Sequence, residues 1–163
     1  MTRLSNLLLV SALLVPGAAF AQTRVSVGAG GGYSGATDES LSNGRGAPIL
    51  MAQLTRPLIP GIGFGAEVDY WKGNASHVAF ATAIAQAHLP VIPLFVKAGL
   101  GYGDGDPDGK GSVSGLAGQL GVMYDITLPA APIALTVFGN ALLAHAALRS
   151  VQTVDAGIAI TWR

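Results

Sequence analysis

Three aspartates in one short stretch have the spacing of calcium ligands. Asp104, Asp106 and Asp108 occupy alternate positions in DGDPDGKGS. Carboxylates at alternate positions before a turning glycine form the first half of a calcium-binding loop. The twelfth position, however, is Gly115 and not the bidentate glutamate. We therefore expect a solvated surface loop with at most a weak Ca²⁺ site at 104–109, and no other cofactor.

Serine and histidine offer a second kind of chemistry. Ser76 is followed by His77, and His145 lies near the same expected end of the fold. A serine activated by histidine is a common hydrolase nucleophile, but adjacency in sequence has little specificity. Histidines that anchor strand ends are the simpler interpretation. We expect no enzyme, with a lipid-acting hydrolase as an alternative.

Five charged residues fall on the polar side of alternating segments. They are Arg24, Glu67, Asp69, Lys97 and Asp155. Buried charges must be paired. The pattern predicts an internal ion-pair network in which Lys97 lies between Glu67 and Asp155. A gated or selective water path along the same residues is the functional alternative.

The composition limits where these residues can sit. Half of the residues are hydrophobic, only 11% are charged, and the mean hydropathy is +0.50. The chain has no cysteine, which excludes disulfides and cysteine-based sites. Basic and acidic residues balance at nine each, without a basic stripe, which argues against nucleic acid as a partner. So apolar a chain must bury its apolar surface in a core or turn it toward lipid.

The N-terminal stretch has the three-part layout of a secretory signal peptide. Arg3 precedes an apolar run at 7–15, and Ala19-Phe20-Ala21 forms a small-x-small cleavage site. This run is too short to cross a bilayer as a helix. We predict a signal peptide at 1–21 and a single mature domain at 22–163. Beyond the leader, no run of about 20 apolar residues suggests a transmembrane helix.

Alternation with period two runs through the mature chain. In IGFGAEVDYW, Ile62, Phe64, Ala66, Val68 and Tyr70 oppose glycines and acids, as in a strand with one apolar face. The same reading gives eight strands, at 24–33, 47–56, 62–71, 76–88, 92–102, 112–124, 133–143 and 153–163. Strands of about ten residues in even number are typical of closed membrane barrels. The alanine-rich segment 76–88 also has helical propensity, but its alternation favours a strand.

The connections between these strands alternate in kind. Polar or glycine-rich segments at 34–46, 72–75, 103–111 and 144–152 follow the odd strands. Paired prolines follow the even strands: Pro57 with Pro60, Pro90 with Pro93, and Pro129 with Pro132. Proline lacks a donor and presets φ, so it ends ladder pairing in short turns. Polar outer loops and short periplasmic turns are the asymmetry of outer-membrane barrels, and they place both termini in the periplasm.

Aromatic residues sort into two belts on the apolar face. Tyr33, Tyr70, Trp71 and Tyr102 fall at the expected outer end, and Tyr124 and Trp162 at the inner end. Amphipathic rings prefer the two membrane interfaces. The rival is a soluble lipocalin-like barrel or sandwich with the apolar face inward. Its exterior would then carry many glycines, which weaken strands.

The mature chain resembles the small eight-stranded OmpA-like and OmpX-like outer-membrane barrels. The resemblance lies in architecture and in the last strand, VDAGIAITWR, although Trp162 is penultimate and Arg163 follows it. It implies an all-β, up-and-down transmembrane barrel in the cell outer membrane, with lipid and the outer-membrane assembly machinery as partners. A structural, anchoring or adhesive role through the outer loops is expected. A narrow pore, a lipid-acting hydrolase and a soluble binding barrel are the alternatives.

Overall fold

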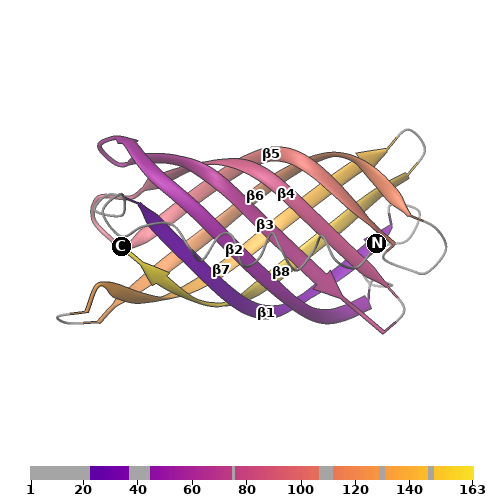
Figure 1. Cartoon of the computed structure of the whole chain (residues 1–163), viewed down its shortest axis with the longest axis horizontal. Helices are drawn as coiled ribbons and strands as arrows, with labels where there is room; N and C mark the ends of the chain where they lie inside the picture. Colours follow the sequence, from indigo (N-terminus) through magenta and orange to yellow (C-terminus); the bar gives the residue numbers. More distant parts are fainter. Residues whose placement is uncertain (1–22, 37–44, 75, 107–111, 129–130, 147–148) are drawn as a thin grey trace, which may run out of the picture.

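The fold is a closed antiparallel barrel of eight strands, as predicted. The computed structural model describes residues 23–36, 45–74, 76–106, 112–128, 131–146 and 149–163. The strands are β1 (Arg24–Ala36), β2 (Arg45–Ile59), β3 (Ile62–Lys72), β4 (His77–His88), β5 (Leu94–Asp106), β6 (Val113–Thr127), β7 (Ile133–Ala146) and β8 (Arg149–Trp162). Each strand pairs with its neighbours in sequence, and β1 pairs with β8 to close the wall (Figure 1). The described residues contain no helix that is long and apolar enough to cross a membrane.

The two ends of the barrel differ. At one end, here called the turn end, short connections join β2 to β3, β4 to β5 and β6 to β7, and β1 begins where β8 finishes (Figure 1). The opposite end is called the loop end. There the ladder is longer than predicted: β5 continues to Asp106, and β7 and β8 pair out to Ala146 and Arg149. The predicted loops at 103–111 and 144–152 are therefore partly strand, because an antiparallel ladder satisfies backbone groups in water as well as in lipid.

The turn end corrects one part of the proline interpretation. Pro57 lies within β2 opposite Gly63, and the register shifts between Pro57 and Ile59. A bulge tolerates proline, because it leaves a position without a ladder donor. The chain reverses just after, at Gly61, whose φ of 80° is in the left-handed region that favours glycine. Pro90 and Pro93 lie in the β4–β5 connection as predicted, and Pro129 lies outside the described residues.

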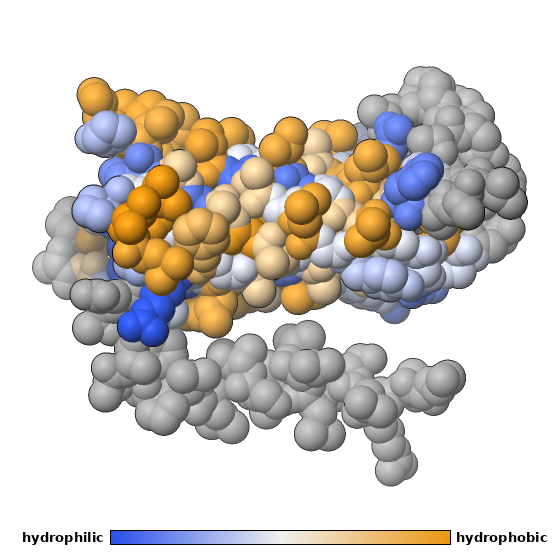
Figure 2. Space-filling view, turned by 90° about the horizontal axis from the view of Figure 1, so that it is seen from above, coloured by the Kyte–Doolittle hydropathy of each residue, from blue (hydrophilic) through white to orange (hydrophobic). Residues whose placement is uncertain are grey.

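The outer wall is apolar. Large hydrophobic side chains point outward along the strands, and Leu100 and Leu116 are 77% and 80% exposed. Orange side chains project from the visible wall over most of its length (Figure 2). The soluble alternative, which turns this face inward, does not fit a wall of this kind. Such a surface is suited to lipid.

The outward aromatics lie near the two ends of the wall. Tyr33, Tyr70 and Tyr102 are exposed toward the loop end. Tyr124 and Trp162 are exposed toward the turn end, opposite Leu94 and Val25.

Trp71 corrects the aromatic prediction. It is 1% exposed and packs inside the barrel with Val78, Phe80 and Leu142. Its indole Nε1 donates to the Gly32 carbonyl at 3.3 Å. As the residue after the outward Tyr70, Trp71 must point inward, because successive side chains of a strand alternate.

The lumen is filled in layers. Toward the loop end, an apolar layer is built on Trp71, Val78, Phe80, Val113, Ala117, Leu142, Ala144 and Val151. Toward the turn end, Met51, Met123, Phe138 and Ala159 form a second layer. Strand β4 turns its larger side chains inward and its alanines outward. Thr82 and Gln86 point into the lumen on the same face as Phe80. A polar layer lies between the two apolar ones.

Candidate functional site

The polar layer is centred on a buried ion pair. Lys97 Nζ donates to Glu67 Oε1 at 2.5 Å and also contacts Oε2, and both side chains have no solvent exposure. Lys97 lies on β5 and Glu67 on β3, so the pair bridges two strands that β4 separates in the wall. The predicted pairing of Lys97 with Glu67 therefore forms.

Neutral donors complete the coordination of Glu67. Gln119 Nε2 donates to Glu67 Oε1, and Asn140 Nδ2 donates to the same oxygen at 3.4 Å. Gln119 is held in turn by Thr82, whose hydroxyl donates to Gln119 Oε1 at 2.5 Å. The residues of this network come from β3, β4, β5, β6 and β7. The network therefore ties most of the wall together through the lumen.

The predicted bridge from Lys97 to Asp155 does not form. Lys97 places its described hydrogen bonds on Glu67 alone. The carboxyl oxygens of Asp69 and Asp155 have no hydrogen-bond partner among the described residues, although both groups are buried. Three buried acids thus surround one lysine, and only one of them is paired. Burying an acid without a partner costs free energy, so this layer is the energetically least favourable part of the interior.

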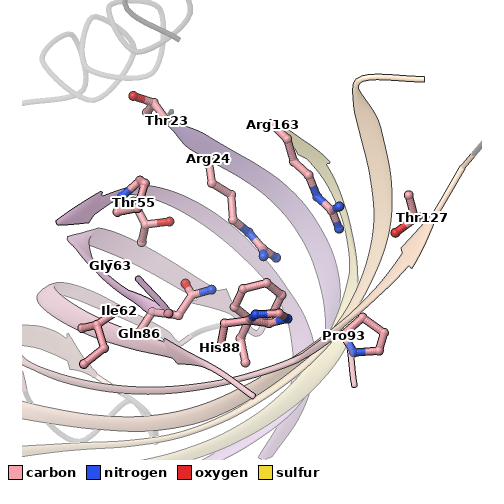
Figure 3. A pocket seen from close by; sticks show the side chains of 13 residues that line it. Thr23, Arg24, Thr55, Ile62, Gly63, Gln86, His88, Pro93, Thr127 and Arg163 are labelled. Atoms are coloured by element: carbon pink, nitrogen blue, oxygen red, sulfur yellow. The ribbon is translucent and has the colours of Figure 1, made fainter. Parts of the chain in front are cut away.

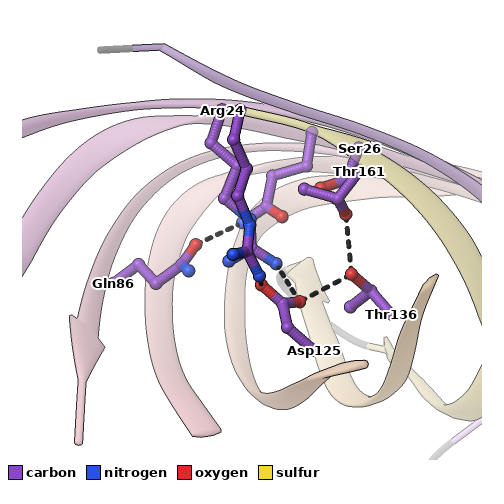
Figure 4. A network of polar contacts seen from close by, with 8 residues as sticks. Arg24, Ser26, Gln86, Asp125, Thr136 and Thr161 are labelled. Atoms are coloured by element: carbon purple, nitrogen blue, oxygen red, sulfur yellow. Dashed lines mark hydrogen bonds and ion pairs between the residues drawn. The ribbon is translucent and has the colours of Figure 1, made fainter. Parts of the chain in front are cut away.

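A second charged cluster lies at the turn end (Figure 4). Asp125 is fully buried and receives Arg24 Nη2 on Oδ1 at 2.7 Å and Arg163 Nη2 on Oδ2 at 2.6 Å. The Thr136 hydroxyl donates to the same Oδ1 at 2.6 Å. The cluster joins β1, β6 and β7 to the residue that follows β8, across the seam where the barrel closes.

A chain of hydroxyls extends the cluster along this seam. Thr136 and Thr161 lie 2.7 Å apart through their hydroxyl oxygens, and Ser26 and Thr161 lie 2.8 Å apart. All three side chains are completely buried. Arg24, which was predicted to belong to the central network, belongs instead to this cluster.

Sequence reasoning missed Asp125 and the inward contact of Arg163. The predicted strand stopped at residue 124, whereas β6 continues to Thr127. Asp125 has the parity of the inward Met123, so a strand extended by one residue would have placed it in the lumen. Arg163 was noted only because it follows the last aromatic residue.

The aspartates near the loop end do not form a calcium cluster among the described residues. Asp104 and Asp106 lie in β5, and Asp108 lies outside the described residues. Asp104 Oδ1 accepts hydrogen bonds from Ser114 and, at 3.2 Å, from Ser112. No group of three possible metal-ligating acids or histidines occurs in the described part of the chain. The carboxylate of Asp104 is instead used to join β5 to the start of β6.

The histidines are placed at the ends of strands. His145 Nδ1 lies 2.6 Å from Ser150 Oγ, across the β7–β8 ladder at the loop end. Ser76 and His77 stand at the start of β4. His88 stacks at 4.7 Å on Phe95 at the turn end. A serine hydrolase also needs donors for the oxyanion and an orienting group for its histidine. The Ser150–His145 contact alone supplies neither.

Comparison with known proteins supports the fold. No protein-family model matches the sequence, and no curated protein is similar to it in sequence. Among solved structures, Neisserial surface protein A aligns with a TM-score of 0.63 at 12% identity, over 86% of this chain and 96% of that one. This chain has the fold of the small outer-membrane barrels.

Two further structures show the same likeness. Ail, the attachment invasion locus protein of Yersinia pestis, aligns with a TM-score of 0.56 at 12% identity. The N-terminal barrel domain of Pseudomonas aeruginosa OprF aligns with a TM-score of 0.55 at 11% identity. Each alignment covers 86% of this chain and 98% of the other. The eight-stranded architecture is therefore shared, while the lumenal and loop residues must be interpreted from this chain itself.

Proposed function

We propose that this protein is an integral outer-membrane barrel that acts through its loop end, in a structural, anchoring or adhesive role and not as an enzyme. The observation that carries the proposal is the filled lumen. Two apolar layers enclose a hydrogen-bonded ion pair, and Trp71, Phe80 and Phe138 occupy the interior. An eight-stranded barrel is just wide enough for its own side chains. A closed interior leaves the exposed ends and the lipid-facing wall as the surfaces available for function.

The location and orientation belong to the same proposal. The apolar wall and its aromatic residues suit a bilayer, and an exported barrel of this size suits the outer membrane. The turn end, where β1 begins and β8 finishes, faces the periplasm, and the loop end faces outward. Outer-membrane lipid and the outer-membrane assembly machinery, which reads the last strand, are the partners that this arrangement requires.

An adhesive role is favoured by one of the structural neighbours. Ail is described as an attachment invasion locus protein, and one of its structures holds the heparin analogue sucrose octasulfate. At 12% identity, the ligand of Ail cannot be assigned to this chain. The shared architecture supports the use of the loop end of this barrel as a contact surface for another cell or its matrix.

Replacement of an outer connection tests this role. We expect that a non-adherent Gram-negative strain producing the protein gains attachment to a cell layer, and that exchange of residues 107–111 for a glycine-serine segment of equal length removes most of the gain. The matched control is the same exchange at 89–93, in a turn-end connection, which should leave attachment unchanged. The readout is the number of attached cells at equal amounts of protein in the membrane.

Two outcomes would contradict this role or the assigned orientation. If neither protein nor variant changes attachment while both reach the cell surface, the adhesive role is wrong and the structural or anchoring role is favoured. If the 89–93 exchange alone removes attachment, the assigned orientation is wrong.

A narrow pore is the second candidate, favoured by the unpaired acids in the polar layer. Asp69 and Asp155 offer polar atoms that water could reach if the apolar layers opened. The pore requires conductance that depends on Lys97, whereas the filled lumen predicts none.

A further inference from the structure

The turn end of the barrel holds a cavity of about 420 Å³. Two guanidinium groups, those of Arg24 and Arg163, line it together with Gln86 and His88 (Figure 3). Figure 3 shows the two arginine side chains lying side by side and reaching in the same direction. Neither an adhesive loop end nor a lipid-anchored wall uses this cavity.

The Arg24 side chain is held by two contacts and still has hydrogen-bond donors that are unused within the described part of the chain. Its Nη2 is bound to Asp125, and its guanidinium lies 4.2 Å from the centre of the Phe95 ring. The side chain is 11% exposed. Nevertheless, its Nε and Nη1 atoms have no hydrogen-bond partner among the described residues. A buried guanidinium with two unpartnered nitrogen atoms is unusual, since nearly all buried polar groups are hydrogen-bonded.

Cationic side chains outnumber acidic ones among the described residues of this mouth. Asp125 is the acid in contact with both arginines, and each of its oxygens is already occupied: Oδ1 by Arg24 and Thr136, and Oδ2 by Arg163. Among these side chains, one carboxylate thus balances one of two guanidinium groups. The remaining positive charge lies at the wall of the cavity, where water is partly excluded and an anion is attracted more strongly than at an open surface.

We propose that this cavity is a binding site for a small oxyanion, a carboxylate or phosphate group on a free small molecule. The planar donor fork of arginine matches the paired oxygens of both groups. Arg24 supplies the fixed fork, and Arg163, whose side chain is 42% exposed, supplies a second cation that can adjust. Between the charged groups the wall is apolar, with Pro57, Ile62, Pro93 and Phe95, which suits the carbon skeleton of a small organic acid.

Titration of the folded mature barrel tests this site. The protein is refolded in an uncharged detergent at low ionic strength, and inorganic phosphate or benzoate is added while backbone amide NMR shifts are followed. We expect saturable shifts centred on Arg24, Gln86 and Phe95, with a Kd on the order of 1 mM. Benzoate should bind more tightly than phosphate because its ring meets the apolar wall.

Substitutions distinguish a built site from general attraction. Arg24→Gln should weaken binding about tenfold or more, since it removes a charge-assisted hydrogen bond. Arg56→Gln is the matched control: Arg56 is exposed on β2 near the same end and outside the cavity wall, so affinity should stay unchanged. Arg163→Gln is the second variant, because its side chain is more exposed than that of Arg24 and Asp125 keeps its contacts with Arg24 and Thr136; it should weaken binding several-fold.

Two results would overturn the proposal. One is the absence of saturation, with shifts that grow in proportion to added salt. The other is equal binding by the Arg24→Gln, Arg163→Gln and Arg56→Gln proteins, which would show that the anion responds only to overall charge.

Discussion

Replacement of Glu67 by glutamine is expected to lower the free energy of unfolding by about 3–5 kcal/mol, because it leaves the Lys97 ammonium buried without its acid. Both side chains have no solvent exposure, so water cannot easily take over the role of the carboxylate. The measurement is urea unfolding of the barrel in lipid vesicles, followed by the change of tryptophan fluorescence. The slope of the transition should stay constant if only the folded state is affected.

Two matched variants separate the pair from its surroundings. The double change Glu67→Gln with Lys97→Met removes both charges and should recover most of the lost stability, because a buried pair replaced as a whole costs little. Asp69→Asn makes the same acid-to-amide change two residues along β3, where the acid has no hydrogen-bond partner in the described part of the chain, and should stabilise the barrel or leave it unchanged. Equal losses in all three proteins would contradict the assignment of Glu67 as the partner of Lys97.

Replacement of Trp71 by alanine is the second large effect, with an expected loss of about 3–5 kcal/mol. The side chain is 1% exposed and belongs to the apolar layer near the loop end. Its removal leaves a cavity that the closed wall cannot collapse to fill, and it also removes the hydrogen bond to the Gly32 carbonyl. The same urea transition measures the loss.

Tyr70 provides the control for Trp71. It is the preceding residue of β3, it is also aromatic, and it points outward with 38% exposure. Tyr70→Ala should therefore cost on the order of 1 kcal/mol, as for a surface position. If Tyr70→Ala proved the more damaging change, Trp71 would belong to the outer belt, as first predicted from the sequence.

The sequence was sufficient for the wall because the wall follows a local rule. Alternation along Ile62–Lys72 distinguishes a lipid face from a lumenal face one residue at a time, and the ladder then closes without further information. Pro90 and Pro93 lie in a connection between strands as predicted, whereas Pro57 lies within β2. The contrast is weaker in the alanine-rich β4, where alternation predicts a strand and the structure places Phe80, Thr82 and Gln86 inward.

The contacts inside the lumen depend on how far each side chain extends and on the depth in the barrel at which residues of several strands lie. Lys97 was expected to serve two acids, but its ammonium lies on Glu67, and Gln119 and Asn140 complete that site. Asp125 was missed because the end of a strand is less certain than its middle. Its partners Arg24 and Arg163 come from the two ends of the chain, and only the closure of the barrel brings them together.

The recording of ion conductance across a planar bilayer tests the central claim, a lumen closed by its own side chains. Purified protein is added after a gel shift between unboiled and boiled samples has shown that it is folded, and a known porin serves as the positive control. The filled interior predicts no conductance steps from this protein, and none from Lys97→Ala. Discrete steps from the wild type that change in size with Lys97→Ala would contradict the account and establish a pore through the polar layer.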